Sequence, residues 1–235
     1  SPVRLKAITV TDEMKRATRG NAIVCSIAPD EDVAVLAGGH AADEVLWKNN
    51  ITGYWCSSSY YGLYPSWAAD KNKEVHGRSS KWEPLLEVEK YNNFGEETPD
   101  AFSYSFNGLK NIREYKTTAC VNDEINEMAK AYLESSLAGQ DDIADCLSLT
   151  YYAGNYNGQS MEERPIEIQD MYVRLDRNIA DLLNYVDRRI GLENVVVSIA
   201  STGYVIENSE DGAKYRLPSG TIYMDRIEGL LNVYL

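Results

Sequence analysis

Apolar runs alternate with helical patterns over the first 50 residues, which is typical of an α/β protein. Residues 9–20 begin with a capping-box pattern and end in a glycine, so they predict a helix. The continuous β-branched run at residues 22–27 predicts a strand buried on both faces. An acidic loop follows at residues 29–32, then a second predicted buried strand at residues 33–36 and a helix at residues 41–47.

A clearer β-α-β unit follows in the second half. After a helix at residues 121–137, the pattern predicts a strand within residues 144–152, a long helix at residues 167–190 and a strand at residues 195–200. A right-handed crossover would make the two strands parallel neighbours in one sheet. Chemistry in such sheets gathers in the loops beyond the carboxyl ends of the strands. Here the loops are residues 29–32, 153–165 and 201–205.

Residues 60–118 lose this periodicity and contain Pro65, Pro84 and Pro99. A stretch of this length without a clear pattern, inside a patterned chain, is typical of a functional insertion. We therefore predict an α/β core formed by residues 1–59 and 119–235. Residues 60–118 are predicted to be a mostly irregular cap over the carboxyl ends of the strands.

Charge and composition narrow the classes of partner. The chain has 235 residues, of which 36 are acidic and 23 basic, for a formal net charge of −13. Such a surface repels nucleic acid and anionic lipid, and no apolar run reaches the length of a membrane span. None of the four cysteines falls in a CxxC pair, so no zinc-knuckle or redox motif is present.

The three loops hold few groups that catalysts use. They offer the carboxylates of Asp30 and Asp32, the amides of Asn155 and Gln159, and the hydroxyl of Thr202 next to Gly203. No phosphate-binding, nucleophile-elbow or HExxH motif accompanies them. By themselves these residues are typical of a solvated acidic loop and of loop side chains that bind backbone groups.

Three stretches together resemble the alkaline phosphatase superfamily, specifically its type I phosphodiesterase/nucleotide pyrophosphatase-like phosphatases of Bacteroidetes type. The first comprises residues 9–15 (Thr-Val-Thr-Asp-Glu-Met-Lys) and 35–43 (Val-Leu-Ala-Gly-Gly-His-Ala-Ala-Asp); the second, residues 82–86 (Trp-Glu-Pro-Leu-Leu) and 89–91 (Glu-Lys-Tyr); the third, residues 141–143, 155–159, 172–176 and 179–183. The resemblance implies an α/β/α sandwich around a mostly parallel sheet. It also implies a two-zinc hydrolase that works through a covalent intermediate on a Thr or Ser.

The family's functional positions differ in this chain. Where active relatives have Asp-Tyr-Val-Gly-His, with two zinc ligands, this chain has Asn155-Tyr-Asn-Gly-Gln159. Where they have Ala-Asp-His-Gly, it has Ser-Thr202-Gly203-Tyr. Where they place phosphate-binding cations in Lys-Asp-Arg, it has Asp30-Glu-Asp32. Neutral amides such as those of Asn155 and Gln159 are poor zinc ligands, and the carboxylates of Asp30 and Asp32 would repel a phosphate. Compared position by position with the family's motifs, the chain therefore has a degenerate site.

We therefore interpret the chain as a pseudoenzyme with a binding or scaffolding role, for which no cofactor is expected although active relatives use zinc. One alternative is an active metal-dependent phosphoric-ester hydrolase whose remaining catalytic residues lie outside this chain. Its metal would be bound by rearranged acids such as Asp30, Asp32, Asp141 and Asp142. Another alternative is a carbohydrate- or peptide-binding module that uses the tyrosines of the cap.

The family pattern extends beyond both ends of the sequence, which therefore resembles a central portion. The expected partners are the missing flanking segments of the same protein, another protein, or a second copy of this chain. Neither nucleic acid nor a membrane is expected. The resemblance alone implies a periplasmic or secreted location, because the sequence itself contains no signal peptide.

Overall fold

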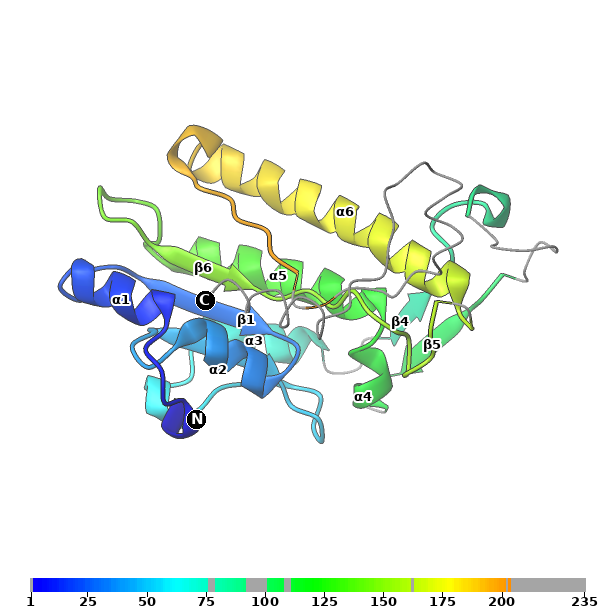
Figure 1. Cartoon of the computed structure of the whole chain (residues 1–235), viewed down its shortest axis with the longest axis horizontal. Helices are drawn as coiled ribbons and strands as arrows, with labels where there is room; N and C mark the ends of the chain where they lie inside the picture. Colours follow the sequence, from blue (N-terminus) through cyan, green and yellow to red (C-terminus); the bar gives the residue numbers. More distant parts are fainter. Residues whose placement is uncertain are drawn as a thin grey trace, which may run out of the picture. The chain divides into compact units, whose positions relative to one another are not determined.

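The computed structural model describes residues 2–75, 79–91, 101–107, 111–161, 163–201 and 203 (Figure 1). The chain divides into two units, Ser1–Val197 and Ser198–Leu235. All the helices and strands given below lie in the first unit.

A four-stranded, mostly parallel sheet forms the centre of this unit. Its strand order is β3-β2-β1-β6, where β1 is parallel to both β2 and β6, and β3 is antiparallel to β2. The strands are β1 (Val24–Ala28), β2 (Glu44–Lys48), β3 (Trp55–Cys56) and β6 (Cys146–Leu149). The predicted strands at residues 22–27 and within residues 144–152 are confirmed, and they are direct neighbours.

Strand β1 is buried on both faces, as its apolar run predicts. Its side chains alternate: Cys25 and Ile27 pack with the helices of one face, while Val24 and Ala28 pack with the helix of the other. Both hydrophobic cores of the unit therefore meet at this strand.

Helices cover both faces of the sheet and make an α/β/α sandwich (Figure 1). One face carries α1 (Val10–Ala17) and α2 (Glu31–Gly38), and the other carries α3 (Ser66–Val75), α5 (Ala119–Ser135) and α6 (Pro165–Arg189). The helices predicted at residues 9–20, 121–137 and 167–190 are confirmed. Among the described residues, none of these helices is long and apolar enough to cross a membrane. Short 3-10 helices cover Pro2–Arg4, Ser59–Tyr61, Val88–Lys90 and Leu192–Asn194.

Two predicted elements between residues 29 and 48 are wrong in type. Residues 33–36 were predicted to be a strand but belong to helix α2. Residues 41–47 were predicted to be a helix, but residues 44–48 form strand β2. In α2, Ala34 and Val35 are buried while Val33 and Leu36 are exposed, which is a helical pattern rather than an alternating one. The β-branched composition favours a strand, but the acidic residues at the start support a helix because they complement its dipole.

The predicted strand at residues 195–200 is also wrong. These residues pair with no strand in the described part of the chain, where β1 is the only strand next to β6. Val196 is 96% exposed, and Val197 and Ile199 are exposed as well. The run Val-Val-Val-Ser-Ile-Ala has strand composition, but a strand also needs a neighbour to receive its hydrogen bonds.

Residues 60–118 contain more regular structure than their pattern predicts. Besides α3, they include strands β4 (Ser79–Trp82) and β5 (Tyr104–Asn107) and the short helix α4 (Ile112–Tyr115). Strands β4 and β5 pair antiparallel with each other in a separate sheet, so the described residues of this segment add no strand to the main sheet, as expected. The division into a core and a cap domain stays a prediction.

A buried carboxylate joins this segment to α6. Asp170 is fully buried and accepts hydrogen bonds from Trp82 Nε1 at 2.6 Å, the Leu85 backbone N–H at 2.6 Å and Tyr91 OH at 2.7 Å. Arg174, one turn further along α6, pairs with the same carboxylate at 2.8 Å. The charge is therefore compensated from four directions, which is the condition for burying it.

Replacing Asp170 should unfold this attachment. Asp170→Ala leaves a partly buried guanidinium and three donors without their acceptor, so we expect a loss of about 3–5 kcal/mol in the free energy of unfolding, measured by urea denaturation. The matched control is Asp176→Asn on the exposed side of the same helix, which should change stability by less than about 0.5 kcal/mol. Equal effects of the two substitutions would contradict the role of Asp170.

Candidate functional site

The candidate site lies at the carboxyl edge of the sheet, beyond the ends of β1 and β6. Because β1 and β6 are parallel, the segments that follow them emerge at the same edge. Residues 29–32 follow β1, and the loop of Asn155 and Gln159 follows β6.

An ion pair that the sequence does not reveal occupies this edge. Lys116 Nζ lies 2.8 Å from Asp30 Oδ1 and donates to Asn50 Oδ1 at 2.6 Å. Lys116 is almost completely buried, and it directly follows α4. The two partners of the pair are 86 residues apart in the chain, so neither a motif nor a spacing connects them.

The predicted acidic loop is the beginning of helix α2. Asp30 occupies the N-cap position, and Glu31 and Asp32 lie in the first turn. Asp30 is paired with Lys116, so it is not the free carboxylate that we expect from the sequence. Asp32 is exposed and makes no ion pair within the described part of the chain, in agreement with a solvated acid.

The loop after β6 contains a tight turn that presents Asn155 and Gln159. The Gln159 backbone N–H donates to Tyr156 O at 2.8 Å across Asn157 and Gly158, whose φ angles are 48° and 79°. An Asn-Gly pair with two positive φ angles is the signature of a type I′ turn, a signal that our reading of the sequence missed.

The Gln159 side chain and the Asn155 backbone take part in the protein's own hydrogen bonding. Gln159 Oε1 accepts from Arg164 Nε at 2.7 Å, and the backbone oxygen of Asn155 accepts from Tyr152 OH at 2.6 Å. In the described residues, no group of three or more His, Cys, Asp or Glu side chains could bind a metal ion. The Gln159 amide oxygen is therefore already bound within the protein.

Aromatic packing fixes the loop against residues of the predicted cap. The Tyr156 ring lies 5.1 Å from that of Trp82 and 4.7 Å from that of Tyr104, measured between centroids. Its hydroxyl donates to Glu114 Oε1 at 2.7 Å, and burial followed by the bond to this carboxylate raises the pKa of Tyr156. The β4–β5 sheet is thus placed on the loop at the carboxyl end of β6.

The remaining predicted positions are not part of this cluster. Asp141 and Asp142 precede β6, so they lie at the opposite edge of the sheet from Asp30 and Asp32. This geometry excludes a metal site shared by all four acids. Gly203 belongs to the second unit, and Thr202 lies outside the described residues.

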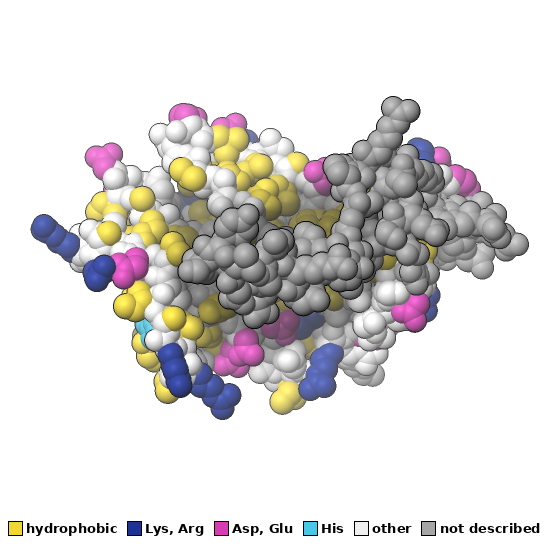
Figure 2. All heavy atoms as spheres, in the orientation of Figure 1, with side chains coloured by type: hydrophobic (Ala, Val, Ile, Leu, Met, Phe, Trp, Pro, Cys, Tyr) yellow, Lys and Arg dark blue, Asp and Glu magenta, His cyan; other side chains and the backbone are white. Residues whose placement is uncertain are grey.

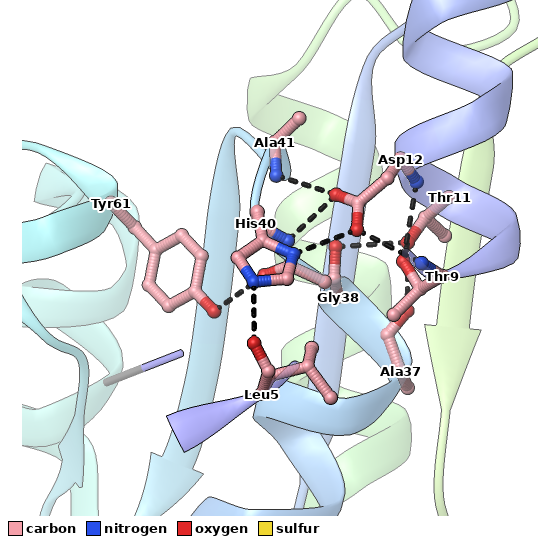
Figure 3. A network of polar contacts seen from close by, with 10 residues as sticks. Leu5, Thr9, Thr11, Asp12, Ala37, Gly38, His40, Ala41 and Tyr61 are labelled. Carbon is pink, nitrogen blue, oxygen red and sulfur yellow. Dashed lines mark hydrogen bonds and ion pairs between the residues drawn. The ribbon is translucent and has the colours of Figure 1, made fainter. Parts of the chain in front are cut away.

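A second polar network connects the N-terminal segment to the turn before β2 (Figure 3). The Asp12 carboxylate accepts from the backbone N–H groups of Thr9, His40 and Ala41 at 2.7–3.0 Å. It also lies 3.0 Å from His40 Nδ1, while His40 Nε2 lies 3.0 Å from the backbone oxygen of Leu5.

This network favours a charged histidine. Both ring nitrogens of His40 face oxygen acceptors, so only the imidazolium can donate to both. The hydrogen bond to Asp12, followed by the one to Leu5, raises the pKa of His40 above its ordinary 6.5. Despite burial, the backbone bond from Thr9 and the bond to His40 lower the pKa of Asp12. All its contacts are internal, so we assign the network a structural role.

The chain is similar in sequence to known proteins. Residues 26–227 match the family model described as type I phosphodiesterase/nucleotide pyrophosphatase. The chain is 30% identical over 221 residues to the alkaline phosphatase PhoV of Synechococcus elongatus, covering 86% of this chain and 40% of the relative. It is 27% identical over 243 residues to the alkaline phosphatase PafA of Elizabethkingia meningoseptica, and this match covers 96% of this chain and 44% of PafA.

Solved structures agree on the fold. A crystal structure of wild-type PafA superposes with a TM-score of 0.68 at 28% identity, covering 83% of this chain and 41% of that chain. The chain thus spans less than half the length of the relatives it matches.

The His40–Asp12 network predicts a specific pH dependence of stability. Because the pKa of His40 is raised in the folded protein, its stabilisation is present below about pH 6.5 and is lost as the pH rises through the raised pKa. Urea unfolding of the wild type should therefore show a stability loss between pH 6 and pH 9 that His40→Asn lacks. If the free energy of unfolding changed equally with pH in the wild type and in His40→Asn, His40 would not be the group responsible.

Proposed function

The chain belongs to the type I phosphodiesterase/nucleotide pyrophosphatase family of the alkaline phosphatase superfamily, and from this membership we propose that it is a catalytically degenerate member with a binding or scaffolding role. The single observation that carries the proposal is the Lys116–Asp30 ion pair. Asp30 lies where the family resemblance implies a cation for phosphate, and Lys116 holds its carboxylate in place.

The loop after β6 supports the proposal independently. Gln159 stands where the resemblance implies a zinc-binding imidazole, and its amide oxygen is bound to Arg164. Arg164 in turn pairs with Glu167 at 3.4 Å. A guanidinium beside a metal position adds a repulsive positive charge, so this arrangement favours an internal structural role over metal binding.

A scaffolding role is supported by apolar surface on the first unit. Figure 2 shows hydrophobic side chains gathered on one face of the molecule. Val10, Leu36 and Val196 are each more than half exposed. Patches of this kind mark surfaces that another chain covers. We propose the flanking segments of the same protein as the occupant, with another protein or a second copy as alternatives, in a periplasmic or secreted setting.

The proposal makes a direct prediction for metal and activity. The longest natural form of the protein should contain no stoichiometric zinc after purification, measured by elemental analysis. It should show no hydrolysis of phosphate monoesters or diesters above the rate of a protein-free blank when zinc is added.

The alternative of an active hydrolase predicts the opposite result. Stoichiometric zinc together with turnover would show that residues outside this chain complete the site, and would overturn the proposal. A wild-type alkaline phosphatase assayed in parallel is the matched control for the zinc loading.

A further inference from the structure

We propose that Asp30 is a built-in anion that closes an oxyanion site formed by Lys116 and Asn50. The site would bind inorganic phosphate or a similar tetrahedral oxyanion only when the Asp30 carboxylate is removed or displaced. This inference rests on the proposed function, because it concerns the same edge of the sheet, and it names the ligand class that the edge retains.

The fold buries the ammonium group of Lys116 at this site. Lys116 is only 4% exposed, and its ammonium group reaches Asp30 at 2.8 Å and Asn50 at 2.6 Å. A buried ammonium group is costly unless an anion compensates it. Lys116 therefore requires one negative charge at this position, and the identity of the group that supplies it is a separate question.

The Asp30 carboxylate lies where an anion from solvent could replace it. The Asp30 side chain is 54% exposed, so its carboxylate lies between the buried ammonium group and solvent. Aspartate at an N-cap usually accepts a hydrogen bond from the first turn of its helix, but Asp30 makes no such bond. Its carboxylate is thus committed to Lys116 and does not stabilise α2 by capping.

Asn50 supplies a second donor to an incoming anion. Its Oδ1 accepts from Lys116 Nζ at 2.6 Å, so the amide group lies next to the ammonium group. Within the described part of the chain, the amide nitrogen makes no hydrogen bond, and Asn50 is exposed. An ammonium group and an amide N–H₂ group are both hydrogen-bond donors to the oxygens of a tetrahedral oxyanion.

Neighbouring charges limit the site to one anion. Glu31 and Asp32 begin helix α2 next to Asp30, so the local charge is negative even after Lys116 is counted. Coulomb repulsion at these short distances disfavours a phosphate beside the Asp30 carboxylate. Phosphate and the Asp30 carboxylate should therefore exclude each other.

The experiment compares two neutralising substitutions on the same helix turn. Asp30→Asn removes the proposed plug, whereas Asp32→Asn makes the same charge change at an exposed residue that does not contact Lys116. Inorganic phosphate is titrated into each folded protein, with binding measured by calorimetry at pH 6 and pH 8. Folding of each variant is checked by circular dichroism.

We expect saturable phosphate binding by Asp30→Asn, at least about tenfold tighter than by the wild type or by Asp32→Asn. Phosphate should also raise the midpoint of thermal unfolding of Asp30→Asn, because a ligand that binds the folded state stabilises it. The double variant Asp30→Asn/Lys116→Met should lose both effects, since it lacks the cation.

Two results would overturn the inference. Equal phosphate affinity of Asp30→Asn and Asp32→Asn would mean that overall charge, and not the Lys116 site, controls binding. Absence of binding by folded Asp30→Asn at both pH values would mean that no oxyanion site exists. Neither result depends on zinc content or wild-type turnover, so failure of this inference is distinguishable from failure of the proposed function.

Discussion

A buried charge must have a partner, and this constraint determines how distant segments of the first unit are joined. Lys48, at the end of β2, is fully buried and pairs with Glu124 of α5 at 2.6 Å. Tyr115 OH donates to the other oxygen of the same carboxylate, and burial, then Glu124, raises the pKa of Tyr115. Because removing one member of such a group leaves an uncompensated charge, the pair links sheet and helix more strictly than apolar contact does.

The same constraint operates at two further points, and each lies beside a segment that hydrophobic packing alone would position loosely. Asp170 attaches the β4 region to α6, and Lys116 attaches the turn after α4 to the start of α2. The candidate site is therefore a by-product of the joints between segments. Lys116 therefore serves the fold and the candidate site with the same ion pair.

The pattern of apolar residues was sufficient to predict elements that are buried on both faces or along one stripe. Strand β1 is buried on both faces, and α5 and α6 each present one apolar stripe, so composition and period agree with the structure. At α2 and at residues 195–200 a β-branched run was misleading. The helix dipole favours α2, and residues 195–200 have no strand neighbour among the residues that the structure describes. The sequence predicted that Asp30 and Gln159 follow strands of the sheet, and the structure agrees, but their partners Lys116 and Arg164 come from contacts that only the fold creates.

Under the proposed function, the Lys116–Asp30 pair explains how a hydrolase fold can lose its chemistry without losing stability. A buried cation is costly when no anion compensates it. The Asp30 carboxylate compensates Lys116 from within the chain, and under the proposed function it also occupies the position of a phosphate. Under the proposed function, stability and loss of activity then have one cause. Restoring a phosphate site would require removing an interaction on which α2 and the turn after α4 both depend.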